Sequence, residues 1–474
     1  MKKDTCKKFI TFGILIIFLG LTITPTINAH ITKIYNVDDC LNIINSDEYK
    51  LLIITPGKFI EPLETLVDHK NEHNMSTRLV TLEEIYDQTS EGRDEAEKIK
   101  YYIKSAIEAW GIEYVLLIGG RKNQFAFSEK WWLPVRYVYL EDSWGRRLNE
   151  NKYISDLYFA DIYDSEGNFS SWDTNNNGIY GEWFDNKSAD DIIDLHPDVY
   201  VGRLPCRNIY EVKIMVKKII NYEKEKCEDS WFKNMVVVAG DTYPGNNYYE
   251  GEFSTQQALE NMSDFNPIRL WTSLDTLTGH MDVIKAIYNG CGFLYFAGHS
   301  NPTHWGTHPP DSEEFVYGLN VIHMPFLFNR KKLPVCLVGG CHTSMFNNSL
   351  FHTSWNSGSP CLECWSWWLT RKVGGGSIAT IGNTALGYGA EDKDNPNEGG
   401  GGERLEVFFF VEYGQNGIDI LGKAWGKAIE EYLRIYPIDW SKNSFHDTAL
   451  DAKSVQQWVI IGDPSLKIGG YSSS

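Results

Sequence analysis

Two residues with catalytic chemistry, His299 and Cys341, each follow a short hydrophobic run that ends in glycine. The first run covers residues 291–297 and the second covers residues 333–338. Cysteine is an effective nucleophile as a thiolate, and a nearby imidazole can produce the thiolate by taking the thiol proton. The residue types therefore indicate a nucleophilic cysteine with a histidine base.

The alternative is that these residues only fill the core, because buried cysteines usually pack as small hydrophobic side chains. Cys291 and Cys336 fit that description, since both lie within the runs. Cys341 lies past its run and after two glycines, where a side chain leaves the core. This position favours the catalytic interpretation of Cys341 and His299.

The elements that must position the pair are strands, since both runs are short, continuous and rich in branched and aromatic residues. Carboxyl ends of parallel strands form the ligand crevice of an open α/β sheet. Strand and helix patterns alternate from residue 49 onwards, which predicts an α/β fold. We expect two packed units with mainly parallel sheets, at residues 49–228 and 229–470. Residues 301–330 are rich in Pro, His and Gly and are expected to be irregular.

Three stretches resemble the gingipain-type cysteine peptidases, family C25 of the caspase-like clan. They are residues 295–306 (YFAGHSNPTHWG) with the later Gly340–Cys341 pair, residues 197–205 (PDVYVGRLP) and residues 461–466 (IGDPSL). The resemblance covers about residues 49–468. It implies a caspase-like second unit, a Cys341/His299 dyad and a protein or peptide substrate.

The resemblance also implies an oxyanion hole formed by the backbone N–H of Cys341 with that of Ser300 or Gly298. The clan usually has Gly after the catalytic His, whereas Ser300 stands there in this chain; serine keeps the N–H group. Gingipain-type enzymes cleave after basic residues, which implies Arg or Lys at P1. The aromatic and glycine content of the loops equally suits a shallow apolar P1 pocket, so both alternatives stay open.

An acidic, loop-rich region between residues 142 and 198 predicts a structural Ca²⁺ site, because hard cations require several oxygen ligands. Residues 173–182 resemble the first half of an EF-hand loop, with oxygen donors at positions 1, 3 and 5 and glycine at position 6. The pattern then breaks, and a series of ordinary Asx and Gly turns is the alternative. The candidate ligands are Asp156, Asp161, Asp173, Asn175, Asn177 and Glu182.

The overall charge excludes some partners and the amino terminus indicates export. The chain has 63 acidic against 44 basic residues, which argues against nucleic acid as a partner. Residues 1–29 combine a lysine-rich start, an apolar run and a small-residue cleavage point, as in a secretory signal peptide. An uncleaved signal anchor is the competing interpretation. Residues 30–48 form a short polar lead, so we expect a secreted protein without stable membrane insertion.

A non-catalytic protein on the same fold is the rival hypothesis, because an α/β fold supports many functions. Such a protein would use the acidic calcium region for adhesion or interaction. A serine hydrolase is disfavoured, since no nucleophile-elbow motif follows a strand.

Overall fold

The central sheet consists of the hydrophobic runs that the sequence marks as strands, in the order β2-β1-β3-β6-β15-β14-β13-β9-β7-β8 within the described residues. A computed structural model describes residues 48–125, 129–224, 227, 230–350, 361–389 and 399–472. The signal segment (1–29) and nearly all of the polar lead (30–48) lie outside these residues. The strands are β1 Leu51–Thr55, β2 Thr77–Thr81, β3 Tyr114–Ile118, β6 Tyr200–Leu204, β7 Asn234–Ala239, β8 Asn266–Trp271, β9 Phe293–Ala297, β13 Val335–Val338, β14 Ala379–Asn383 and β15 Trp458–Ile461.

Strand direction changes once in this order, between β14 and β15. These two strands pair antiparallel, whereas β15 pairs parallel with β6. The strands on each side of that junction run parallel to one another. The prediction of an α/β fold with mainly parallel strands is therefore confirmed. Residues 225, 226, 228 and 229 lie outside the described residues, and the unit boundary near 228 stays a prediction.

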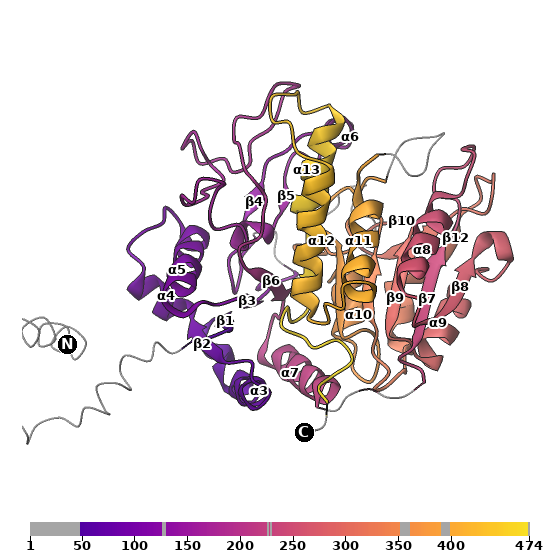
Figure 1. The fold of residues 1–474 in the computed structure, drawn as a ribbon, viewed down its shortest axis with the longest axis horizontal. Helices are drawn as coiled ribbons and strands as arrows, with labels where there is room; N and C mark the ends of the chain where they lie inside the picture. Colours follow the sequence, from indigo (N-terminus) through magenta and orange to yellow (C-terminus); the bar gives the residue numbers. More distant parts are fainter. Residues whose placement is uncertain are drawn as a thin grey trace, which may run out of the picture. The chain divides into compact units, whose positions relative to one another are not determined.

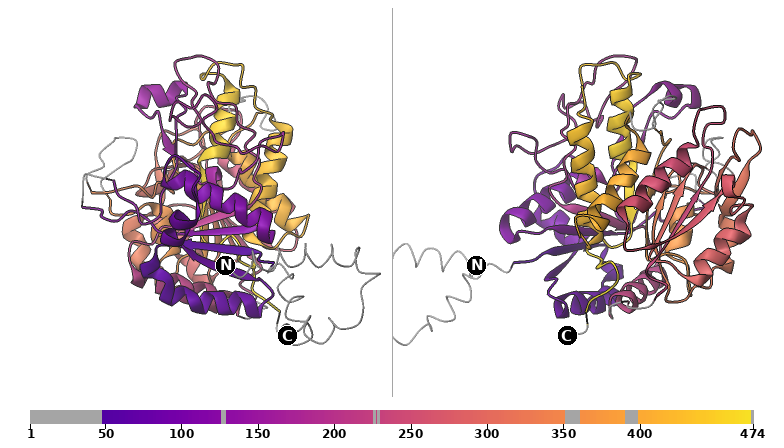
Figure 2. Two further views of the ribbon diagram at one scale, coloured as in Figure 1. Left: turned by 90° about the vertical axis from the view of Figure 1, so that its left-hand side faces the viewer. Right: turned by 45° about the vertical axis from the view of Figure 1, so that its right-hand side comes forward.

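Alternate residues of the buried strands face opposite layers, as the period of two requires. Phe293 and Tyr295 of β9 pack in the cluster that contains Phe410. Leu294 and Phe296 of the same strand belong to the cluster on the other face. Figure 1 shows α11, α12 and α13 standing together in front of the sheet, and Figure 2 gives the view from two further sides. The helices are α3 Ile60–Glu72, α4 Leu82–Gln88, α5 Glu95–Trp110, α6 Ser143–Leu148, α7 Ile209–Glu223, α8 Glu250–Asn261, α9 His280–Asn289, α10 Trp365–Thr370, α11 Gly402–Gly414, α12 Leu421–Ile435 and α13 Asp447–Gln457.

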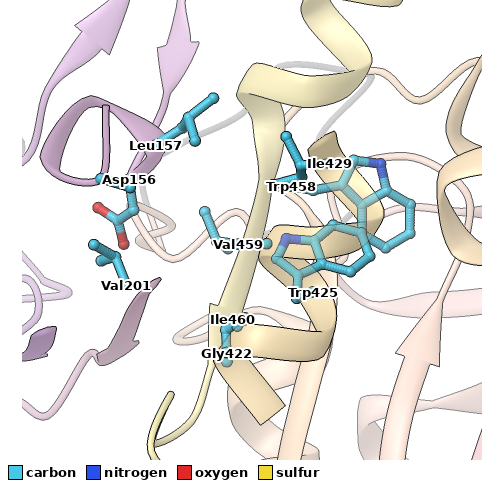
Figure 3. A pocket seen from close by; sticks show the side chains of 11 residues that line it. Asp156, Leu157, Val201, Gly422, Trp425, Ile429, Trp458, Val459 and Ile460 are labelled. Atoms are coloured by element: carbon cyan, nitrogen blue, oxygen red, sulfur yellow. The ribbon is translucent and has the colours of Figure 1, made fainter. Parts of the chain in front are cut away.

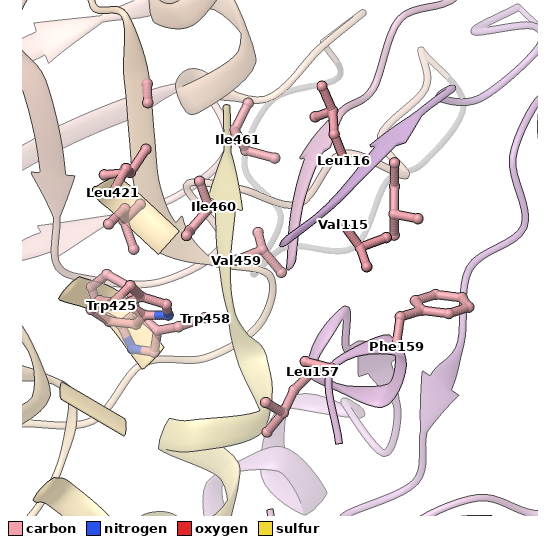
Figure 4. Packing of buried hydrophobic residues seen from close by; sticks show 14 of the residues in the cluster. Val115, Leu116, Leu157, Phe159, Leu421, Trp425, Trp458, Val459, Ile460 and Ile461 are labelled. Atoms are coloured by element: carbon pink, nitrogen blue, oxygen red, sulfur yellow. The ribbon is translucent and has the colours of Figure 1, made fainter. Parts of the chain in front are cut away.

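The core at β15 joins the early and late parts of the chain. Trp458 and Val459 of β15 lie between Trp425 of α12 on one side and Leu157 on the other (Figure 4). Leu157 belongs to the short helix η2 Leu157–Phe159. Because β15 comes from the last part of the sequence and pairs with β6, the carboxyl-terminal segment completes the sheet.

The segment at residues 301–330 is more regular than its composition predicts. It contains β11 His304–Thr307, β12 Val316–Asn320 and η4 Val321–Phe326. β11 pairs antiparallel with β10 His299–Ser300 and with β12. The expectation of an irregular loop is therefore wrong, because the antiparallel pairing of consecutive strands outweighs the turn-forming composition. Other short elements are β4 Tyr137–Val138, β5 Tyr153–Ile154, η1 Gly57–Phe59 and η3 Thr272–Leu274.

No helix among the described residues has both the length and the apolar character that a membrane crossing needs.

Candidate active site

The pairing of β9 with β13 brings the two candidate residues to one pocket. Val338 of β13 lies opposite Phe296 of β9, and the N–H of Gly339 donates to the Phe296 carbonyl at 2.8 Å. The two parallel strands therefore end at the same level of the sheet. His299 and Cys341 follow these ends and line one pocket.

Cys341 lies on a tight turn whose Gly340 and Cys341 carbonyls both accept hydrogen bonds. Gly340 has φ +107, and a Cβ there would lie 2.8 Å from the Gly298 carbonyl oxygen. The Gly340 carbonyl accepts a hydrogen bond from Asn383 Nδ2 at 2.6 Å. The Cys341 carbonyl accepts one from Ser300 Oγ at 2.8 Å. Only glycine fits this close approach, which explains the glycine before the cysteine.

The imidazole of His299 is oriented by a backbone carbonyl. Its Nε2 lies 2.7 Å from the Thr242 carbonyl oxygen. A carbonyl can only accept, so Nε2 carries the proton and Nδ1 keeps the free lone pair. The rings of Tyr243 and His308 meet the His299 ring edge to face, each with a centroid distance of 5.7 Å. A backbone partner has no signature in the sequence, and sequence reasoning missed it.

Both reactive groups rest in their uncharged forms. Burial raises the pKa of the Cys341 thiol to about 11, and the Gly387 carbonyl lies 3.8 Å from its Sγ. Burial also lowers the pKa of His299 below its usual 6.5, opposed by the Thr242 hydrogen bond and reinforced by His308. Each shift disfavours the charged form, which is the effect of desolvation. The pair is therefore arranged for proton transfer during attack rather than for a preformed ion pair.

The backbone groups named for the oxyanion hole lie around the same turn. Gly298 and Ser300 both pack against Gly340, since their backbone atoms would lie 2.8 Å from a Cβ at that glycine. Within the described part of the chain, the Cys341 N–H donates to no protein acceptor, so this group is available to a ligand.

Two carboxylates of α11, Glu403 and Glu406, also line the pocket, and sequence reasoning missed both. Burial raises the pKa of Glu403 to about 7, reinforced by the charge of Glu250. Burial also raises the pKa of Glu406 well above its usual value. Their spacing of three residues puts both on one face of a helix, a signal that is common on any helix and therefore uninformative alone.

The candidate calcium ligands divide into two groups. Both oxygens of Asp156 accept hydrogen bonds from Arg203 at 2.7 Å, and Asp161 accepts one from Trp172 Nε1 at 3.0 Å. Burial raises the pKa of Asp161 to about 7, which the nearby Lys100 opposes. Asp156 is thus committed to Arg203, whereas Asp161 contacts the residue directly before the EF-hand-like loop.

The loop at residues 173–182 holds the other candidates together. The carboxylate of Asp173 accepts the N–H groups of Asn177 and Gly178, both at 2.9 Å. Glu182 Oε2 accepts hydrogen bonds from the side-chain amides of Asn175 at 3.5 Å and Asn177 at 2.5 Å. Among the described residues, no group of three or more His, Cys, Asp and Glu side chains is close enough to hold a metal. Oxygen donors in this loop therefore come from amides as well as carboxylates.

A second pocket lies at β15, away from the reactive pair. Trp425, Trp458 and Val459 line it on one side and Asp156 on the other (Figure 3). The Trp425 and Trp458 rings are 5.5 Å apart. Asp156 is paired with Arg203, so this pocket is a packing gap without a free reactive group.

Comparisons with known proteins agree with this geometry. The model of peptidase family C25 matches residues 44–469. Gingipain R2 of Porphyromonas gingivalis is 20% identical over 285 residues, which are 59% of this chain and 31% of that protein. Gingipain R1 from the same organism is 19% identical over 59% of this chain and 23% of its own length. The chain thus spans about a third or less of the length of these curated relatives.

Solved structures share the fold. The complex of the Porphyromonas gingivalis RgpB pro- and mature domains has a TM-score of 0.60 at 19% identity, covering 88% of this chain and 79% of that one. The Arg-specific cysteine proteinase gingipain R (RgpB) has a TM-score of 0.59 at 19% identity, covering 89% and 78%. These likenesses confirm the gingipain-like, caspase-type architecture that the sequence motifs imply. With the family model matching nearly all of the described chain, this protein belongs to peptidase family C25.

Proposed function

We propose that this chain is a secreted cysteine endopeptidase with Cys341 as nucleophile and His299 as general base. The observation that carries the proposal is the convergence of both residues on one pocket from neighbouring parallel strands. Membership of family C25 supports the same reaction class. Proteins or peptides are the proposed substrates.

The reaction begins with proton transfer from the Cys341 thiol to Nδ1 of His299, while Sγ bonds to the scissile carbonyl carbon. The imidazolium then gives that proton to the leaving amine as the C–N bond breaks. Water next attacks the thioester while His299 takes one of its protons; the C–S bond then breaks, the acid is released, and the imidazolium returns the proton to Sγ of Cys341. The Thr242 carbonyl stabilises the imidazolium at Nε2, because its hydrogen bond favours the charged ring.

The developing oxyanion is proposed to accept hydrogen bonds from the N–H of Cys341 and from that of Ser300 or Gly298. A preformed donor contributes about 3–4 kcal/mol to such a transition state. The proposal is supported by the packing of these backbone segments against Gly340.

Direct tests are the substitutions Cys341→Ala and His299→Ala, measured with a fluorogenic peptide mixture and by thermal melting. Each should reduce turnover by at least about 1,000-fold while the fold is retained. Cys361→Ala is the matched control, since that thiol is also partly exposed but does not line the pocket, and its turnover should equal the wild type. Wild-type turnover by folded Cys341→Ala would remove the assignment and favour a binding protein.

We propose a preference for Arg or Lys at P1, recognised by Glu403 and Glu406. Support comes from their position in the pocket and from their burial without an ion pair to any described residue. A guanidinium or ammonium group would replace that missing partner through charge-assisted hydrogen bonds.

Because the carboxyl groups in the pocket titrate, we expect the preference for a basic P1 residue to depend on pH. Glu403 has a pKa of about 7, so its carboxylate is mostly neutral below that pH and ionised above it. The ratio of kcat/KM for an Arg peptide to that for its uncharged citrulline analogue should therefore rise from pH 6 to pH 8. Glu403→Gln and Glu406→Gln should lower the ratio. A flat ratio, or better cleavage after apolar residues, would refute the acidic pocket.

A structural Ca²⁺ ion is proposed in the loop at residues 173–182. Asp173, Asn175, Asn177 and Glu182 supply oxygen donors on one short loop, which suits a hard cation. Asp191 adds a buried carboxylate beneath it, accepting the N–H groups of Thr174 and Glu182. The ion would share the Asp173 carboxylate with the guanidinium of Arg93 and would replace hydrogen bonds within the loop.

Secretion is proposed from the composition of residues 1–29. Sequencing the amino terminus of the exported protein checks it: a start close to residue 30 is expected, whereas a retained residue 1 in a membrane fraction would favour the anchor.

A further inference from the structure

A buried lysine, Lys453 of α13, joins two carboxylates from the distant loop region. Its Nζ lies 2.8 Å from Asp142 Oδ2 and 2.9 Å from Glu150 Oε1. The side chains of Lys453 and Asp142 are fully buried, and that of Glu150 is 9% exposed. Asp142 precedes α6 and Glu150 follows it, so one cation holds both ends of this short helix. Burial of three charges is costly unless each is well paired.

The same carboxylates hold the two segments that form the reactive pocket. Glu150 Oε2 contacts His342 Nε2 at 2.5 Å, and Glu150 Oε1 accepts the N–H of Leu386 at 3.0 Å. Asp142 Oδ1 accepts the hydroxyl of Tyr388 at 2.6 Å. His342 directly follows the nucleophile, and Tyr388 lines its pocket.

His342 needs such an anchor because its backbone is strained. Its φ of +58 lies in the left-handed region, which few residues other than Gly adopt, although His does so more often than most side chains. Its N–H donates to the Ala385 carbonyl at 2.8 Å, which joins the nucleophile's turn to the pocket wall. An unfavourable backbone conformation persists only where surrounding contacts hold it.

The two charges also act on the nucleophile itself. Burial is the largest cause of the raised Cys341 pKa; beyond it, the carboxylate of Glu150 raises this pKa and the ammonium of Lys453 lowers it. Other titratable groups that face the pair are Asp142, the phenols of Tyr388 and Tyr153, and the imidazole of His342. Since the two opposite charges lie 2.9 Å apart, their effects on the thiol largely offset each other while both are present.

We propose that Lys453, Asp142 and Glu150 form a positioning cluster that fixes the Cys341–His342 turn and the Ala385–Tyr388 pocket wall in the arrangement used for attack. This inference rests on the proposed function, since it assumes that Cys341 is the nucleophile. The three residues touch neither substrate nor reacting atoms; they hold the turn and the wall through His342, Leu386 and Tyr388, and their charges act on the thiol from a distance.

The test compares Glu150→Gln with Lys453→Met, measuring the alkylation of Cys341 by iodoacetamide between pH 6 and pH 11 in the full chain. Removing the negative charge should shift the reactivity profile to lower pH, and removing the positive charge should shift it to higher pH. Each shift should be about half a pH unit or more. A purely structural role would not move the two profiles in opposite directions.

Turnover supplies the second measurement. His342→Asn keeps a residue that tolerates a positive φ but is too short to reach Glu150, and it leaves Lys453 paired. We expect it to fold and to lose about 10- to 100-fold in kcat with little change in KM, because the nucleophile is displaced but the pocket is intact. Lys427→Met, which removes the partly exposed Lys427–Glu430 pair of α12, is the matched control and should match the wild type in both assays.

The outcomes separate the inference from the function beneath it. If wild-type Cys341 shows no selective alkylation, the proposed function and the inference both fall. If it is selectively alkylated but both charge variants keep the wild-type profile, or folded His342→Asn keeps the wild-type kcat, the inference alone falls. If Lys453→Met does not fold, Glu150→Gln and His342→Asn decide the outcome.

Discussion

Replacing Gly340 by alanine tests the turn that presents the nucleophile. At φ +107, a residue with a Cβ is strained by about 1–3 kcal/mol. The added Cβ would also lie 2.8 Å from the Gly298 carbonyl oxygen and 2.8 Å from the Ser300 nitrogen, both backbone atoms that cannot rotate away. Overpacking of this kind costs about 1–3 kcal/mol more. We therefore expect a loss of about 2–6 kcal/mol in the free energy of unfolding.

Urea denaturation measures this loss, and alkylation of Cys341 with peptide turnover measures the displacement of the thiol. Gly374→Ala is the matched control, because Gly374 has φ +76 but nothing lies within 4 Å of its would-be Cβ. That variant should lose only the strain of about 1–2 kcal/mol and keep wild-type turnover. Should Gly340→Ala prove as mild as Gly374→Ala, with normal alkylation and turnover, the close approach of the turn to residues 298–300 would be refuted.

Three further predictions follow from other parts of the molecule. Because His299 must be neutral to accept a proton and its pKa is lowered, the acid limb of kcat/KM should lie below pH 6.5; a limb above pH 7 would contradict this assignment. A chelator should lower the melting temperature while leaving the alkylation of Cys341 nearly unchanged. An unaltered melting temperature, together with elemental analysis that finds no metal bound to the protein, would exclude the ion. Lys218→Met should lower the free energy of unfolding in urea by about 2–5 kcal/mol, because the half-buried Lys218 donates to three backbone carbonyls at residues 370–375. Lys213→Met on the exposed face of α7 should lower it by less than about 0.5 kcal/mol.

The local hydrophobic pattern of the sequence was sufficient to predict the strands that carry the site. Residues 293–297 and 335–338 are strands because continuous branched and aromatic runs bury both faces of a sheet. The glycines after them predicted where His299 and Cys341 would leave the core. The same reasoning failed for residues 301–330, where composition indicated a loop and pairing with β10 produced strands.

Motifs in the sequence by themselves determined the family, the alternation of strands and helices, and the pair of residues offered for catalysis. Only the tertiary structure decided which strands are neighbours, and so which groups share the pocket. The Thr242 carbonyl, Glu403 and Glu406 belong to the pocket through sheet order and helix packing. Glu150 and Lys453 are 303 positions apart in the sequence yet 2.9 Å apart in space. Hydrophobic periodicity reports only the face that a residue buries within its own element, whereas contacts between elements depend on how the whole chain packs.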